Sequence, residues 1–266
     1  MPPIKSNQNR LSASVQRKLY SADSQCSANC KYCFSKWKTA YTSLPHISEE
    51  QSFIDCDCII YPCCDGEVLC GRDYIESIKR VSDSFRKVYV SISTKVGYSN
   101  DFLSSISELD SFLKTEKKGF VKLSLSVSNK SMIDELEPGT LSYDNRLLLA
   151  QECAAKGIFT SVTMKPILPF IPDDEYYCIV DDYLNVTDRI LLGGLYVETH
   201  SFFYEHYIKN KYNTTPREVL WLPSHPSWPY VIQDDKIERI HNYALRKNAQ
   251  VFDTDSDVIL SFEYKG

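Results

Sequence analysis

Short segments rich in β-branched and aromatic residues alternate with amphipathic segments along most of this 266-residue chain. We expect six strands, at 18–22, 58–61, 87–92, 121–127, 158–164 and 189–195. Helices are expected between them, for example at 74–85 and 143–156, where Gly157 is placed to cap the second. Most strand spacings suit βα units of about 30 residues. The pattern therefore predicts an α/β fold, a partial (β/α)6 TIM-type barrel with a C-terminal extension.

The same reading divides the chain into three parts. Residues 1–17 form a polar N-terminal segment, and residues 18–195 form the barrel. Residues 196–266 form an extension, with an aromatic segment, a loop rich in proline and tryptophan, a helix at 235–247 and a last strand near 258–262. We expect this extension to cover the barrel.

Composition narrows the class of protein. The hydrophobic content of 43% and charged content of 24% are ordinary for a chain with a substantial core. No apolar run approaches the roughly 20 residues that span a bilayer, and the first residues lack the apolar stretch of a secretory signal. We therefore expect a cytoplasmic protein without a membrane partner. The net charge of −5 gives no general attraction to nucleic acid.

Ten cysteines are many for this length, and in a reducing compartment clustered cysteines more often bind metal or do redox chemistry. Cys26, Cys30 and Cys33 form a C-x3-C-x2-C motif directly after the first expected strand. Three thiolates leave one iron of a four-iron cluster without a protein ligand, and a small molecule can bind there. The alternatives are scattered core cysteines or a zinc knuckle, although zinc sites usually close with a second paired motif that is missing after Cys33.

With Tyr32 before its last cysteine, this motif resembles that of the radical S-adenosylmethionine superfamily. Four further pieces resemble its spore photoproduct lyase-like branch: SISTK (91–95), SLSVS (124–128), ELEPGTLSYDNRLLLA (135–150) and MKPILPFIPDDE (164–175). The resemblance implies a [4Fe–4S] cluster on Cys26, Cys30 and Cys33, with S-adenosylmethionine on the open iron. It also implies reductive cleavage to methionine and a 5′-deoxyadenosyl radical, which abstracts a hydrogen atom from a substrate. A low-potential electron donor such as flavodoxin or ferredoxin would supply the electron.

The resemblance also implies cofactor-binding residues. Tyr32 would lie against the adenine, and Lys95 would face the carboxylate, where a charge-assisted hydrogen bond is strong. Ser126 would face the ribose or amino group, unless it is a strand serine pointing to solvent. The turn after the second strand would bind the amino group through its main chain. That turn is Asp65-Gly66-Glu67, which departs from the family form at Asp65 and otherwise resembles an ordinary Asp-Gly turn.

Other residues allow two interpretations each. Cys63 and Cys64 precede this turn, and the resemblance implies that one of them donates a hydrogen atom to a product radical. Cys56 and Cys58 share one face of a strand and would be buried as small apolar side chains. The alternative is an auxiliary cluster formed by the cysteines that crowd this strand, namely Cys56, Cys58, Cys63, Cys64 and Cys70.

Glu137 and Arg146 would form an internal ion pair that fixes the loop after the fourth strand, or would contact a ligand. The reaction class stays open between lyase, transferase and oxidoreductase. The substrate is a small molecule, a peptide or a nucleic acid. Aromatic residues of the extension could stack on bases or pack as a lid: Phe202, Phe203, Tyr204, Tyr207, Tyr212, Trp221 and Trp228. A metal-binding module without catalysis is a third possibility.

Overall fold

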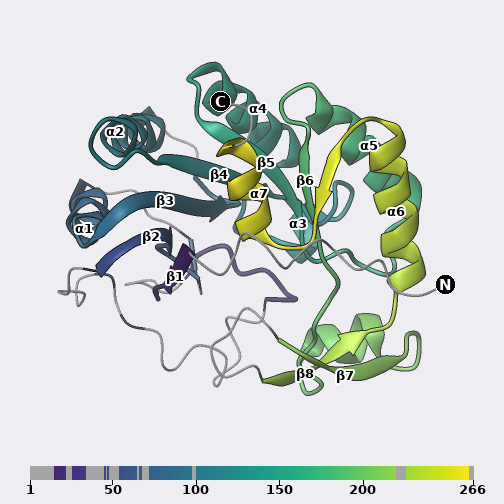
Figure 1. The fold of residues 1–266 in the computed structure, drawn as a ribbon. Helices are drawn as coiled ribbons and strands as arrows, with labels where there is room; N and C mark the ends of the chain where they lie inside the picture. Colours follow the sequence, from purple (N-terminus) through teal and green to yellow (C-terminus); the bar gives the residue numbers. More distant parts are fainter. Residues whose placement is uncertain are drawn as a thin grey trace.

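The computed structural model describes residues 15–21, 26–33, 45, 47, 54–64, 66–67, 72–97, 100–219 and 226–263. Seven parallel strands form one curved sheet in the order β1-β2-β3-β4-β5-β6-β9 (Figure 1). The strands are β1 (Val15–Leu19), β2 (Ile54–Tyr61), β3 (Phe85–Thr94), β4 (Phe120–Ser126), β5 (Phe159–Met164), β6 (Arg189–Leu192) and β9 (Gln250–Phe252). The expected partial α/β barrel is confirmed, with one strand, β9, beyond the six predicted.

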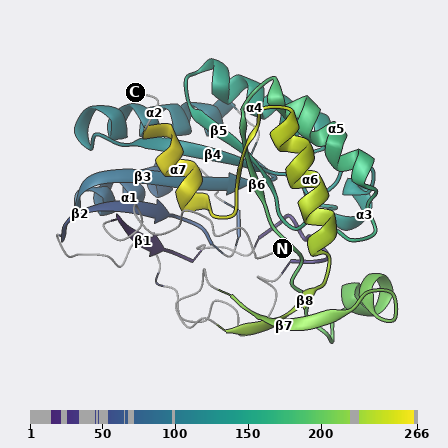
Figure 2. The same cartoon turned by 45° about the vertical axis from the view of Figure 1, so that its right-hand side comes forward.

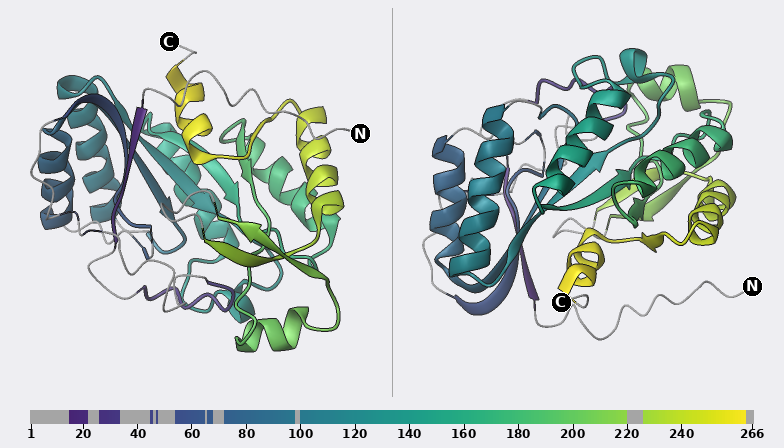
Figure 3. Two further views of the ribbon diagram at one scale, coloured as in Figure 1. Left: turned by 60° about the horizontal axis from the view of Figure 1, so that its bottom comes forward. Right: turned by 90° about the horizontal axis from the view of Figure 1, so that it is seen from above.

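Four helices cover the outer face of the sheet: α1 (Arg72–Ser82), α2 (Asn100–Glu116), α4 (Tyr143–Ala155) and α5 (Asp173–Leu184) (Figure 3). A fifth helix, α6 (Asp234–Arg246), packs against α5, and the short α3 (Ile133–Leu136) follows β4. Aliphatic side chains of the strands, such as Val90, Leu123 and Val162, are fully buried against these helices. Such β-branched runs are typical of parallel strands covered on both faces.

A seventh helix, α7 (Asp255–Glu263), lies on the concave face of the sheet (Figure 2). The last strand expected near 258–262 is therefore wrong. A short apolar run does not distinguish a strand from a buried helix, and acidic residues in the first turn favour a helix start. Ile259 and Phe262 pack here among Tyr89, Phe120 and Phe159.

The segment after β6 carries a π-helix (Tyr204–Ile208) and an antiparallel pair, β7 (Thr214–Glu218) and β8 (Ser227–Val231). The pair is attached at the carboxyl end of β6, because the Val231 N–H donates to the Leu195 carbonyl at 2.9 Å. The expected division of the chain at residue 196 stays a prediction. The segment that follows it contributes β9, which pairs with β6 in the barrel sheet. Within the described residues, no helix combines the length and apolar character needed to cross a bilayer.

Candidate functional site

The cysteine motif lies on a loop (residues 26–33) that follows β1, at the carboxyl ends of the strands. A turn after β4 holds this loop by two main-chain hydrogen bonds. Lys31 N–H donates to the Leu136 carbonyl at 2.8 Å, and Gly139 N–H donates to the Ala28 carbonyl at 3.1 Å. A Cβ at Gly139 would lie 2.2 Å from the Ser27 carbonyl oxygen. The two segments therefore touch through their backbones, which only glycine allows at this position.

The thiols of Cys26, Cys30 and Cys33 form no disulfide and lie close enough for each to influence the ionisation of Cys30. Burial raises the pKa of Cys30 to about 11, and the neighbouring Cys33 and Cys26 oppose its ionisation further, while Lys95 favours it. Iron ions would relieve this repulsion between thiolates. Among the described residues, no three His, Cys, Asp or Glu side chains converge on a single ion. A cluster does not need such convergence because each thiolate binds a different iron, so the donor set fits a cluster better than a single zinc ion.

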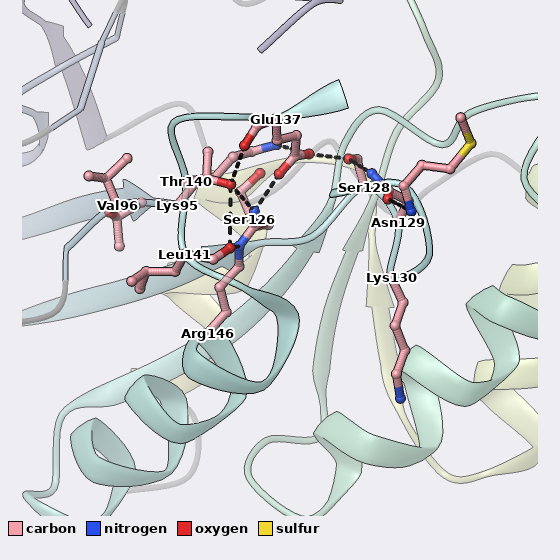
Figure 4. A network of polar contacts seen from close by, with 12 residues as sticks. Lys95, Val96, Ser126, Ser128, Asn129, Lys130, Glu137, Thr140, Leu141 and Arg146 are labelled. Carbon is pink, nitrogen blue, oxygen red and sulfur yellow. Dashed lines mark hydrogen bonds and ion pairs between the residues drawn. The ribbon is translucent and has the colours of Figure 1, made fainter. Parts of the chain in front are cut away.

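A buried polar network connects this loop, through Tyr32, to the ends of β3 and β4. Figure 4 shows its part around Lys95, Glu137 and Arg146. The Lys95 ammonium donates to the Glu137 carboxylate at 2.7 Å and to the Tyr32 hydroxyl oxygen at 2.5 Å. The hydroxyls of Tyr32 and Ser128 donate to the same carboxylate oxygen. Since Tyr32 lies between Cys30 and Cys33, this network fixes the loop from inside the protein.

Glu137 also forms the expected ion pair with Arg146, whose guanidinium lies 2.5 Å from the second carboxylate oxygen. Both side chains are fully buried. Burial disfavours the charged carboxylate, but Lys95 and Arg146 outweigh it and lower the pKa of Glu137 to about 2. Arg146 further donates to the Ser126 carbonyl at 2.9 Å and thereby fixes the end of β4. The carboxylate is thus ionised between two cations.

Glu67 is half-buried and bonds to Lys95, a member of this network. Its carboxylate accepts hydrogen bonds from the Lys95 main-chain N–H at 3.0 Å and from the Thr94 hydroxyl at 2.6 Å. Burial raises the pKa of Glu67, and these hydrogen bonds offset part of that rise. The side chain therefore ties the loop after β2 to the end of β3. Gly66 directly precedes Glu67 in the chain. Asp65 lies outside the described residues.

The remaining cysteines divide between the core and the carboxyl end of β2. Cys58 is fully buried and Cys56 packs against the same outer core, as expected for small apolar side chains. Cys63 is half-buried, and Cys64 N–H donates to the Tyr20 carbonyl at 2.9 Å, next to the end of β1. Cys70 lies outside the described residues, so the auxiliary-cluster reading stays untested.

Most described aromatic residues of the extension are packed. Phe203 is buried with its ring edge-on to Tyr32 at 5.9 Å between centroids, and Tyr207 stacks on Phe203 at 5.1 Å. The extension therefore contacts the cysteine loop as a lid would. Phe202 differs, because it is 70% exposed and stacks on His206. Trp221 lies outside the described residues.

Sequence reasoning missed Ser128 as a partner of Glu137, and it also missed Thr163 and Lys165 at the end of β5. A usable signal was present. Strands covered on both faces are mostly continuous apolar runs, yet β4 carries a polar residue at every second position from Lys122, and β5 carries Ser161 and Thr163 on one face. Such alternation in a buried strand indicates a polar inner face.

No protein-family model matches the chain, and neither does any curated protein. Solved structures do match. A spore photoproduct lyase variant with bound AdoMet and dinucleoside spore photoproduct is 15% identical, covering 82% of this chain and 68% of its own, with a TM-score of 0.52. A second lyase variant with dinucleoside spore photoproduct is 16% identical, covering 84% and 70%, with a TM-score of 0.53.

SuiB of Streptococcus suis, bound to S-adenosylmethionine, is 13% identical and covers 91% of this chain and 50% of its own, with a TM-score of 0.52. At these identities the likeness concerns the fold. The expected resemblance to radical S-adenosylmethionine enzymes, including the spore photoproduct lyase-like branch, is confirmed at that level.

Proposed function

We propose that this protein is a radical S-adenosylmethionine enzyme. The observation that carries the proposal is the loop with Cys26, Cys30 and Cys33 at the carboxyl end of a partial parallel barrel, anchored by the buried Lys95–Glu137 pair. Active sites of such barrels lie at that end. When bound and reduced, a [4Fe–4S] cluster would supply the electron that cleaves S-adenosylmethionine to methionine and a 5′-deoxyadenosyl radical, and that radical would abstract a hydrogen atom from the substrate.

The three thiolates would hold three irons of the cluster. Lys95 would bind the carboxylate of S-adenosylmethionine, because an ammonium has three donors and two are used by Tyr32 and Glu137. Ser126 makes no hydrogen bond through its hydroxyl within the described residues, so it suits a ribose or amino group. The main chain at Gly66 would contact the amino group, and Tyr32 would border the adenine.

Anaerobic purification and reconstitution would test this function. We expect brown protein with about four irons per chain, and release of methionine and 5′-deoxyadenosine on addition of dithionite and S-adenosylmethionine. Cys30→Ala should lose iron and cleavage together, whereas Cys178→Ser, an exposed cysteine in α5, should lose neither. Colourless protein that carries zinc would contradict the proposal. A bound cluster without cleavage would instead favour a non-catalytic metal-binding module.

A second candidate substrate class is a nucleobase or short nucleic acid. Two observations favour it: the fold likeness to structures that hold dinucleoside spore photoproduct, and the exposed ring of Phe202, which is the chain neighbour of the Phe203 that contacts Tyr32. Stacking of a base on one aromatic ring is worth about 1–3 kcal/mol. We therefore expect Phe202→Ala to weaken the binding of a fluorescent single-stranded oligonucleotide by about tenfold or more. Unchanged binding, or none in the wild type, would exclude this candidate.

A further inference from the structure

The concave face of the sheet carries polar side chains where β4 and β5 end. Ser124 pairs in register with Ser161, and Ser126 pairs with Thr163. Neighbours in register point to one face, and alternate residues of a strand share it. Phe159, two residues before Ser161, contacts Phe262 of α7, so this row faces the inside of the barrel.

Thr163 stands apart within this row. The hydroxyls of Ser124 and Ser161 bond to each other at 3.0 Å. Thr163 is only 7% exposed, and its hydroxyl has no hydrogen-bond partner within the described residues. An unsatisfied buried polar group destabilises the folded state, and native proteins contain few of them. A hydroxyl in this position is suited to a ligand that hydrogen-bonds to it.

Lys165 extends the same face directly after β5. Its stem lies across Gly193 at the end of β6, where an added Cβ would lie 2.2 Å from the lysine Cε. A glycine at 193 is therefore what leaves room for this side chain. The Lys165 ammonium donates to the main-chain carbonyl of Asp253 at 3.0 Å. It forms no ion pair with any carboxylate of the described part of the chain.

Among the described residues inside the barrel, the positive charge of Lys165 is not balanced by a carboxylate of its own. The negative charge of Asp255 in α7 acts on Lys165, but Asp255 already pairs with the fully buried Lys122 and accepts a hydrogen bond from Ser91 at 2.7 Å. Burial lowers the pKa of Lys165, and the negative charges of Asp255 and Asp253 oppose that shift. Asp253 itself is exposed, so water screens its carboxylate. An anion beside Lys165 would compensate the charge.

The sheet order separates this group from the residues that we assign to the cofactors. The cysteine loop, Glu67 and Lys95 follow β1, β2 and β3. Thr163 and Lys165 end the fifth strand of the sheet, and Ser126 on β4 lies between the two groups. The described residues that we assign to the cofactors thus do not include Thr163 and Lys165. Because α7 fills part of the barrel interior, a ligand at these two residues would be small.

We propose that Thr163 and Lys165 bind the oxyanion group of a small-molecule substrate, either a phosphate ester or a carboxylate. The proposal rests on the proposed function and names the substrate class of that site. The ammonium supplies the charge, and the threonine hydroxyl donates to an anionic oxygen. Hydrogen bonds to charged groups are worth about 1.5–3 kcal/mol, which corresponds to roughly tenfold or more in affinity.

The test uses the reconstituted protein and two probes, inorganic phosphate and acetate, titrated at constant ionic strength with chloride as the control. We expect at least one probe to raise the thermal midpoint of the wild type. Lys165→Met keeps the stem but removes the charge, and it should weaken that binding by at least about tenfold. Lys130→Met, an exposed lysine paired with Asp182, is the matched control and should bind as the wild type does. Which probe binds distinguishes a phosphate from a carboxylate site.

Thr163→Val gives a second test that does not depend on Lys165. Because the hydroxyl has no partner within the described residues, its removal should leave the midpoint of the ligand-free protein unchanged or raised, while anion binding weakens. Equal binding by wild type and both variants, or binding of neither probe, would overturn the proposal. Cleavage of S-adenosylmethionine without substrate is measured in the same samples. Lost cleavage with retained anion binding would contradict the proposed function alone.

Discussion

Glu137 is the residue on which the geometry of the site depends most. One carboxylate oxygen faces Lys95, Tyr32 and Ser128, and the other faces Arg146. A buried carboxylate between two cations is stable only as a group, because removing one charge leaves the others unpaired in a poorly solvated place. Its contacts connect the cysteine loop, the end of β3 and the start of α4. Glu137 is thus a positioning residue for the candidate site.

Acid titration would measure this role. The folded-state pKa of Glu137 is about 2, below its ordinary value of 4.5, so its contribution to stability is present above about pH 4.5 and is lost as the pH falls toward 2. Glu137→Gln should destabilise the cluster-free protein at pH 7 by about 3–5 kcal/mol in urea unfolding. The variant should also lose less stability than the wild type between pH 5 and pH 3. Asp134→Asn, an exposed carboxylate in α3, should match the wild type at both values. Equal acid sensitivity of Glu137→Gln and wild type would contradict the assignment.

Cys63 and Cys64 lead to a different prediction at the residue scale. The main-chain N–H of Cys64 donates to the Tyr20 carbonyl next to the end of β1, and its thiol donates to the Tyr61 carbonyl at the end of β2 at 3.7 Å. If one of the two cysteines returns a hydrogen atom to a product radical, replacing both by alanine should leave cleavage of S-adenosylmethionine intact and change the product distribution. Mass spectrometry of the products measures this. Identical products and turnover would exclude the role.

At the scale of elements, α7 is held in the barrel by buried charge as well as by apolar contact. Asp255 in its first turn pairs with Lys122, which is fully buried in β4. Glu263 in its last turn pairs with Lys87 of β3. Between these ends, Phe262 packs on Phe120 and Phe159. The helix therefore fills part of the barrel interior. The polar row of β4 and β5 (Ser124, Ser126, Ser161 and Thr163) lies on the same concave face of the sheet.

A double-mutant cycle would test whether the Asp255–Lys122 pair stabilises the position of α7 in the barrel. Asp255→Asn leaves the Lys122 ammonium buried without its carboxylate and should cost about 3–5 kcal/mol in urea unfolding. Adding Lys122→Met removes the stranded charge and should restore most of that loss, because apolar replacement of a buried pair is often neutral or stabilising. Additive effects of the two substitutions would show that the pair is not coupled.

How far the sequence predicts these elements depends on the signal each carries. The cores of β3, β4, β5 and β6 were predicted because β-branched runs between helical segments are a local property. The strand expected near 258–262 is instead α7, since the same apolar residues suit either structure until the barrel interior selects one. β9 is only three residues long and carries little pattern of its own. Its strand conformation depends on the pairing with β6.

At the scale of the whole molecule, the site joins residues far apart in sequence. The Glu137–Arg146 pair was predictable because both residues belong to one local segment. The contact between Tyr32 and Glu137 spans 105 residues and follows from the closure of the barrel, which no local pattern encodes. The cysteine loop itself was predicted, but not the turn that holds it. The sequence therefore predicted the residues that carry the chemistry of the site, but not the long-range contacts that hold them in place.

Gly139 gives a test of that long-range support. An alanine there would place a methyl group against the Ser27 carbonyl, with main chain on both sides. We expect Gly139→Ala to separate the turn from the cysteine loop and to reduce iron incorporation during reconstitution several-fold. The far-ultraviolet circular dichroism should stay close to that of the wild type, because Gly139 is exposed and lies outside every helix and strand. Full iron incorporation would mean that the loop does not need this contact.

The contact between Gly139 and the cysteine loop also bears on the order in which the site is assembled. In a growing chain, Cys26, Cys30 and Cys33 are synthesised about a hundred residues before the turn that holds their loop. The two hydrogen bonds that hold the loop require β4 and the following turn to be in place. Under the proposed function, metal would therefore be delivered late, to a folded barrel, and the thiols would need protection from oxidants until then.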